Sequence, residues 1–263
     1  MKTLYARAIW LRNCGRFTHI SSDFGSQYHT HTFVTSEALY ASLTRGVTWR
    51  HQGRFVDLET DAKKSTSPDY FLWDYDITQK PIWFTPGVFV DECMRQLAKQ
   101  DKIADTHDFN VISEGYPSTS STPLGSPRDF WVPTFGKIET ILPGYTLVAY
   151  GFSYSLGELN MFSRNQIFLL GKKRTMFQIT ELSDVIEGSH KKGYCDTEWW
   201  IEVPPVFGDK FQRFEVLGAT MRYLILRGMT KDSLDYVEFN FSDGRTIRLP
   251  YFYLKTVPLN DRA

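Results

Sequence analysis

The first part of the chain alternates apolar and polar residues and then changes to a helical spacing. Residues 4–11 alternate, which predicts a first β-strand. The polar stretch 18–27 that follows contains a Gly-Ser pair, which permits a tight turn, so it predicts a loop between a strand and a helix. Residues 36–44 place leucines one turn apart behind a Ser, which predicts a short helix.

The sequence of the middle of the chain predicts two more strands, a helix and an irregular segment. Residues 82–90 read IWFTPGVFV, a buried strand with a bulge or an edge position at Pro86, and residues 91–100 predict a second helix. Residues 113–129 are rich in Ser, Thr, Pro and Gly and lack any period, which is typical of a disordered segment or a functional projection. A strand is predicted again at 145–154.

The C-terminal half predicts β-structure. Residues 167–170 and 176–180 form two strands around a basic turn, and a further strand is predicted at 221–226. Residues 236–241 alternate, and Asp243-Gly244 predicts a hairpin that returns through 246–249. Together these elements predict one α+β domain over residues 1–263, built on an antiparallel sheet and ferredoxin-like, with a β-rich part at about 195–263.

Composition and charge narrow the function. The chain has 263 residues, among them 20 Phe, 14 Tyr and 7 Trp, and its 30 basic residues balance 30 acidic ones. A polyanion could therefore be held only by a local basic patch or with the help of neighbouring subunits. Cys14, Cys93 and Cys195 lack the spacing of a zinc site or a disulfide framework. With no long apolar run and no signal peptide, the sequence predicts a soluble cytoplasmic protein that needs no metal or cofactor.

The densest basic cluster is the turn formed by Gly171, Lys172, Lys173 and Arg174. Three successive cations repel one another unless they face water or phosphates, so the turn is either a phosphate clamp or a solvated connection between strands. Gly25 and Ser26 could hold an anion through free backbone N–H groups, or they could form an ordinary loop.

A catalytic alternative uses Tyr28, His31 and Lys172. These groups could cleave RNA by activating a 2′-hydroxyl and stabilising the leaving group. Alternatively, one histidine of the Tyr28-His29-Thr30-His31 run packs on the sheet and the other faces solvent. A third possibility is a β-rich interaction protein that binds no RNA.

Several short motifs occur in an order that resembles one family. They are LYARAIWL, FGSQYHTHTFVTSEALYASL, WFTPGVFV, FGKIETILPGYTLVAYG, FLLGKKRTMFQI and MRYLILRG. In this order they resemble the RAMP-superfamily subunit that caps the 5′ handle of CRISPR RNA in Cascade complexes, in its type I-D version. The Ser/Pro-rich stretch 113–127 matches no motif of the family.

The resemblance implies a ferredoxin-like (RRM-like) domain with an inserted thumb, which we place at about 91–143. It implies a non-catalytic subunit for antiviral defence that binds the CRISPR RNA 5′ handle, the Cascade backbone subunit, the large subunit and target DNA near the duplex-entry end. Arg128, Trp131 and Lys137 would then lie along the base of the thumb. The groove for the handle would be lined by Gly25, Ser26, Gln27, Gly171, Lys172, Lys173 and Arg174.

Overall fold

A computed structural model describes residues 3–24, 27–36, 38–40, 42–43, 82–90, 104–111, 134–170, 175–220 and 223–254. The described chain is mostly β-sheet with a few short helices, and its strands pair antiparallel except at one contact. The predicted helix at 91–100 lies outside the described residues. No helix among those ranges is long and apolar enough to cross a membrane.

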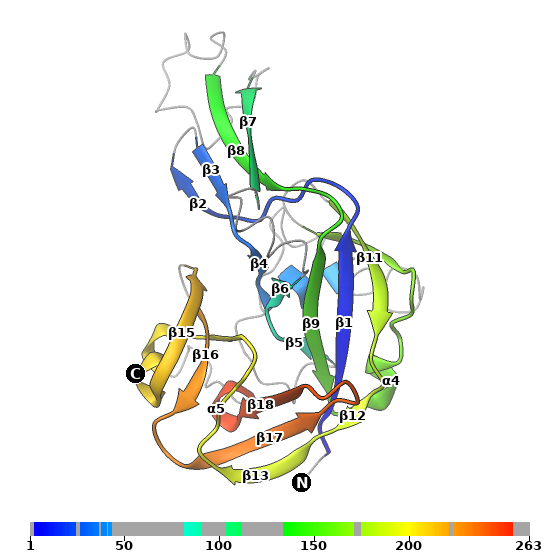
Figure 1. The fold of residues 1–263 in the computed structure, drawn as a ribbon, viewed down its shortest axis with the longest axis vertical. Coiled ribbons are helices and arrows are strands. Elements are labelled where there is room, and N and C mark those ends of the chain that lie inside the picture. The colour runs from blue at the N-terminus through cyan, green and yellow to red at the C-terminus, as the bar shows by residue number, and fades with distance from the viewer. Residues whose placement is uncertain are drawn as a thin grey trace, which may run out of the picture.

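The main sheet has eight strands (Figure 1), and two apolar clusters pack on it. Its path in space is β10 (Ile167–Leu170), β11 (Thr175–Leu182), β1 (Tyr5–Asn13), β9 (Thr146–Ser153), β6 (Gly87–Phe89) and β4 (Phe33–Val34). Two short strands complete it, since β12 (Ile186–Glu187) pairs with β1 and β5 (Trp83–Phe84) pairs with β9.

Strands β1 and β9 lie at the centre of the sheet, and both have buried residues on each face. Ala6 and Ala8 of β1 face one core cluster, and Ile9 and Leu11 pack into another. Burial on both faces removes the need for polar residues along a strand, which is why the predicted strand at 145–154 reads as a nearly continuous apolar run.

The predicted strand at 82–90 is divided at Thr85 and Pro86, where a bulge or an edge position was expected, into β5 and β6, both paired with β9. Thr85 fills the break: its N–H donates to Tyr150 O at 2.9 Å, and its hydroxyl accepts from Tyr150 N at 3.0 Å. Because Pro lacks an N–H, the ladder cannot run through this position, and the Thr85 side chain satisfies the backbone donor left over.

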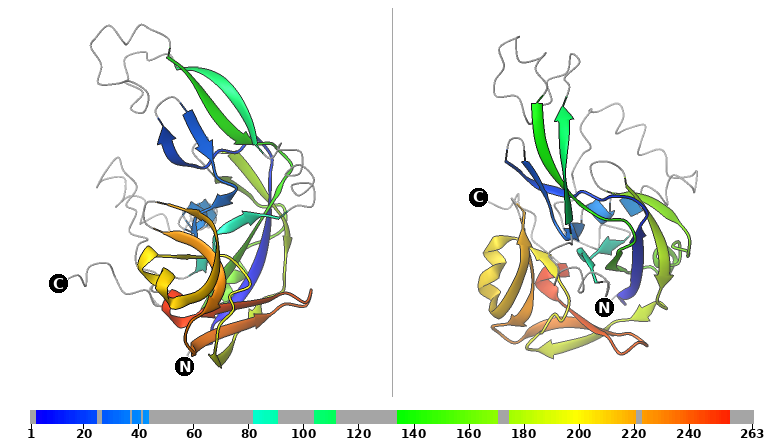
Figure 2. Two further views of the ribbon diagram at one scale, coloured as in Figure 1. Left: turned by 60° about the vertical axis from the view of Figure 1, so that its left-hand side comes forward. Right: turned by 45° about the horizontal axis from the view of Figure 1, so that its top comes forward.

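A second sheet of four strands extends from one end of the main sheet in every view (Figures 1 and 2). Its order is β2 (Ile20–Phe24), β3 (Gln27–Thr30), β8 (Thr134–Ile141) and β7 (Ala104–Val111), and β3 runs parallel to β8. The prediction of a loop over 18–27 was therefore wrong. Residues 20–24 and 27–30 pair with each other, and the second of these strands also joins β8, more than a hundred residues away, through Gln27 and Tyr28. No local pattern encodes that second pairing.

The C-terminal strands form two three-stranded sheets. One contains β13 (Ser189–Gly193), β17 (Leu234–Asn240) and β18 (Thr246–Pro250), and the other contains β14 (Ile201–Val203), β16 (Leu224–Thr230) and β15 (Phe211–Ala219). Short helices accompany the sheets. Residues 36, 38–40 and 42–43 are helical, as predicted for 36–44, and further helices are α4 (Leu156–Leu159), the 3₁₀ helix η2 (Pro205–Lys210) and α5 (Tyr251–Leu254).

These sheets pack on the main sheet through the core cluster that contains Ala6 and Ala8. Val237, Phe239 and Phe241 are buried, as their alternation predicts. The strand predicted at 221–226 begins at Leu224 and continues to Thr230, because it pairs with β15 as far as the Phe211–Thr230 register pair, and Gly228 and Thr230 also bond to the segment 195–197.

Candidate nucleic-acid interface

The projecting sheet is attached to the main sheet by a buried asparagine. Asn13, at the end of β1, is 1% exposed. Its Nδ2 donates to Leu142 O at 2.7 Å, and its Oδ1 accepts from Tyr145 N at 2.7 Å. Gly144 turns the chain here with φ +98 and donates its N–H to Asn13 O at 2.9 Å. The chain between β8 and β9 is thereby fixed in direction.

The predicted phosphate turn connects to this same end of the main sheet. Gly171, Lys172, Lys173 and Arg174 lie outside the described residues, but their neighbours Leu170 and Thr175 are register partners. The Thr175 hydroxyl donates to Arg16 O at 2.6 Å, and Phe17 is bridged to Ile141 of β8. The ends of the basic turn are thus anchored beside the root of the projecting sheet.

The structure brings two other predicted residues together. Gln27 of β3 is the register partner of Lys137 of β8, and Tyr28 is the partner of Ile138. Lys137 is four residues from Ile141, which corresponds to about 13 Å along a strand. The parallel pairing therefore places Gln27 and Lys137 a short distance above the root of the projecting sheet. Other predicted residues, namely Gly25, Ser26, Arg128 and Trp131, lie outside the described residues.

Two arginines that the sequence analysis did not single out lie at the same end. Arg12 near the end of β1 and Arg16 just beyond it are both exposed. Backbone hydrogen bonds hold this segment against β11, since Cys14 N donates to Met176 O at 2.8 Å. Isolated arginines in a strand and a loop carry no sequence signal of function. Only the three-dimensional fold places this segment beside β11, whose first residue, Thr175, directly follows the basic turn in the sequence.

The catalytic alternative depends on His31, which follows β3. The His31 ring stacks on Phe33 with centroids 4.4 Å apart, and its Nε2 is buried without a hydrogen-bond partner among the described residues. Burial lowers the pKa of His31 below the usual value for histidine. Burial, and to a lesser degree the charge of His31, lowers the pKa of His19 to about 4. Lys172 lies outside the described residues, so its distance from His31 is not defined.

No protein-family model and no curated protein sequence matches the chain. Among solved structures it is similar to a chain in the cryo-EM structure of "the Type III-B Cmr-beta bound to cognate target RNA", with 10% identity and a TM-score of 0.41. That match covers 70% of this chain and 61% of the other, so this chain spans about three fifths of its length.

A chain from the same complex bound to cognate target RNA and AMPPnP, state 1, is 9% identical with a TM-score of 0.40, over 87% of this chain and 86% of that one. Neither similarity assigns a family.

Proposed function

We propose that the protein is a non-catalytic RNA-binding subunit of a CRISPR surveillance complex, which holds the 5′ handle of the guide RNA. The observation that carries the proposal is the convergence of separate segments on one end of the main sheet. The flanks of the 171–174 turn, the exposed Arg12 and Arg16, and the paired Gln27 and Lys137 all belong to that end or to the sheet that rises from it.

The charge distribution supports a short single strand as the ligand. The chain as a whole has a formal net charge of zero, so its attraction for RNA must be local. On this proposal, cations from three separate segments together supply such a local patch, which would neutralise a few successive phosphates. A projecting sheet beside the patch offers edges and faces for splayed bases, which is how single-stranded RNA is read.

The assignment of the subunit to a particular type of complex rests on the order of the sequence motifs. We place the subunit in the type I-D Cascade complex, with a ferredoxin-like domain whose thumb, at about 91–143, includes the β7–β8 hairpin. On this assignment it contacts the backbone subunit, the large subunit and target DNA near the duplex-entry end, and it acts in the cytoplasm.

The position of His31 favours binding over cleavage. A general base must reach the 2′-hydroxyl that it deprotonates, directly or through one water. The Nε2 atom of His31 is buried and the ring is stacked on Phe33, so the nitrogen does not face a strand of RNA lying on the surface. The protein should therefore retain the handle without cutting it.

Binding is tested with a handle-length RNA oligonucleotide and the purified chain over a series of salt concentrations. Replacing Lys172, Lys173 and Arg174 by Ala should weaken binding and reduce the log–log salt slope by up to about 0.7 per lost phosphate contact. The control replaces two exposed lysines elsewhere on the chain, Lys192 on β13 and Lys231 just after β16. Equal slopes for the wild type and the triple variant would remove the turn from the RNA site.

Cleavage is tested separately with precursor RNA in the absence of metal. The proposal predicts a shifted band and intact RNA. A cyclic-phosphate product that disappears in His31→Ala would instead establish the endoribonuclease alternative.

A further inference from the structure

Strand β15 is an exposed edge. It ends the order β14-β16-β15, and no strand in the described part of the chain pairs with its outer side. Residues 212–216 are all exposed. Register shifts lie between Phe211 and Arg213 and between Val216 and Gly218, so a short regular stretch lies between two irregularities. An uncovered edge of this kind is a template for a further strand.

The hydrogen bonds of β16 define which backbone groups of β15 face outward. Gly228 is the register partner of Phe214. Its N–H donates to Thr197 Oγ1 at 3.0 Å and its carbonyl accepts from Thr197 N at 3.0 Å, so both groups point away from β15. Gly228 and Phe214 are therefore a non-hydrogen-bonded pair, and the N–H and C=O of Phe214 point to the open edge.

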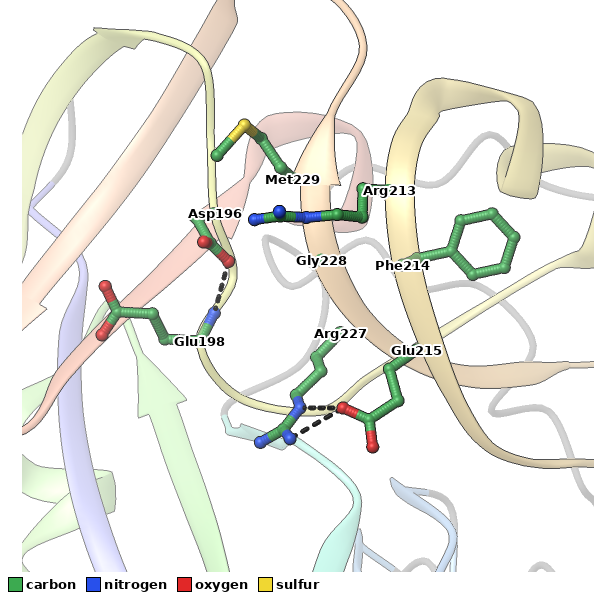
Figure 3. Close-up of a pocket in the computed structure, with 8 residues that line it drawn as sticks. All are labelled: Asp196, Glu198, Arg213, Phe214, Glu215, Arg227, Gly228 and Met229. Carbon is green, nitrogen blue, oxygen red and sulfur yellow. Dashed lines mark hydrogen bonds and ion pairs between the residues drawn. The ribbon is translucent and has the colours of Figure 1, made fainter.

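The side chains along this edge alternate in chemistry. Phe214 and Val216 are 44% and 47% exposed. Arg213 and Glu215 point to the opposite side, into a groove of about 580 Å³ (Figure 3).

Glu215 is held in place there. Its Oε2 accepts from Arg227 Nε at 2.8 Å, and the Arg227 guanidinium lies 4.6 Å from the centroid of the Trp200 ring. The exposed sequence Arg213-Phe214-Glu215 is thus a cation, an aromatic ring and an anion in a row.

We propose that this edge pairs with the same edge of a second copy of the chain, antiparallel and centred on Phe214. A two-fold axis at Phe214 lets the two Phe214 residues exchange their outward hydrogen bonds. It also places Arg213 of each copy opposite Glu215 of the other, in the pair type whose side chains approach most closely. A segment that complements itself in this way suits an isologous interface.

Neighbouring registers are disfavoured by charge. Centring the axis on residue 213 would oppose two arginines, and centring it on residue 215 would oppose two glutamates. Only the Phe214 register joins unlike charges while using the outward backbone groups. Because the regular stretch is short, the interface is small and the dimer should dissociate at low concentration. This pairing does not depend on RNA binding.

The register is tested by a cross-link in the full-length chain with Cys14, an exposed thiol, changed to Ser. Phe214→Cys lies on the axis, where Cα atoms of a hydrogen-bonded pair are about 5.5 Å apart, within disulfide reach. Val216→Cys is the control, because its two copies would lie roughly 13 Å apart. A disulfide-linked dimer for Phe214→Cys alone is expected. No cross-link, or equal cross-linking of both variants, would overturn the register.

The charge pairing is tested by sedimentation equilibrium of the purified chain. Arg213→Glu or Glu215→Arg should raise the dimer dissociation constant roughly tenfold, since two attractive pairs become repulsive. The double exchange should restore dimerisation, and thermal unfolding checks that each variant remains folded. The proposal is contradicted if the chain is monomeric at every concentration or pairs only with a different protein. It is also contradicted if neither charge reversal changes the dimer dissociation constant.

Discussion

Glu202 provides the sharpest test of the folded structure. It lies on β14 and is 1% exposed, and its Oε2 accepts from Ser36 N at 2.7 Å. Ser36 begins the helical stretch near the N-terminal end of the chain, so one carboxyl joins the C-terminal sheets to a segment 166 residues away. We propose to replace it by Gln, which has the shape of the protonated carboxyl and keeps an acceptor for Ser36.

The size of the expected stability difference follows from the pKa of Glu202. Burial raises the pKa of Glu202 from 4.5 to about 7, although hydrogen bonds from Ser36 oppose the shift. A folded-state pKa above the unfolded value means that the protonated form favours folding: this contribution is complete below pH 4.5 and is lost as the pH rises through 7. At about 1.4 kcal/mol per unit, the ionised carboxyl opposes folding by about 3 kcal/mol at alkaline pH.

Urea unfolding of the wild type and Glu202→Gln at several pH values measures this difference. The variant should be more stable by about 2–3 kcal/mol near pH 8 and should lose most of that advantage near pH 4. The exposed Glu187→Gln serves as control and should leave the profile unchanged. Parallel pH profiles for the wild type and Glu202→Gln would refute the reasoning, because they would mean that the carboxyl is not desolvated.

Two further substitutions test other buried polar groups. Asn13→Ala removes the side-chain hydrogen bonds to the backbone N–H of Tyr145 and to the carbonyl of Leu142, so urea unfolding should show a loss of about 2–4 kcal/mol; a loss under about 1 kcal/mol would contradict the anchoring role. Hydrogen bonds from Lys191 and then Arg248 lower the pKa of Glu238 to about 2, so its contribution is present above pH 4.5 and lost as the pH falls through 2. Glu238→Gln should cost about 2–3 kcal/mol at neutral pH and almost nothing near pH 2, and equal losses at both pH values would disprove the ionic origin.

The strands that were predicted correctly are those whose own residues carry a clear sequence pattern. The β17–β18 hairpin has alternating apolar residues and an Asp243-Gly244 turn, where Gly244 adopts φ +86, a conformation that favours glycine. Strand β9 was recognisable because it is buried on both faces and therefore apolar throughout.

Strands that depend on distant partners were missed. Residues 27–30 join the distant strand β8, residues 20–24 pair in turn with 27–30, and β13 reads SHKKG with every residue wholly or partly exposed. Hydrophobic periodicity indicates that one face of a strand is buried, and the sequences of these strands show little such periodicity.

Only some residues of the candidate RNA site could be predicted from the sequence. The basic turn at 171–174 is visible as a charge cluster, whereas Arg12 and Arg16 become candidates only after β1 is placed beside β11. The pairing of Gln27 with Lys137 is likewise a property of strand register, which depends on the whole sheet. Glu202 is a similar case, since nothing near it in sequence indicates that its partner is Ser36.

The most direct test of the central claim is to isolate the native particle through an affinity tag on this chain and to sequence the RNA that accompanies it. The proposed function predicts short guide RNAs that share one 5′ sequence, with this end protected from nuclease by the wild-type chain and exposed when Lys172, Lys173 and Arg174 are replaced. A particle without RNA, or with RNAs that have no common 5′ end, would contradict it.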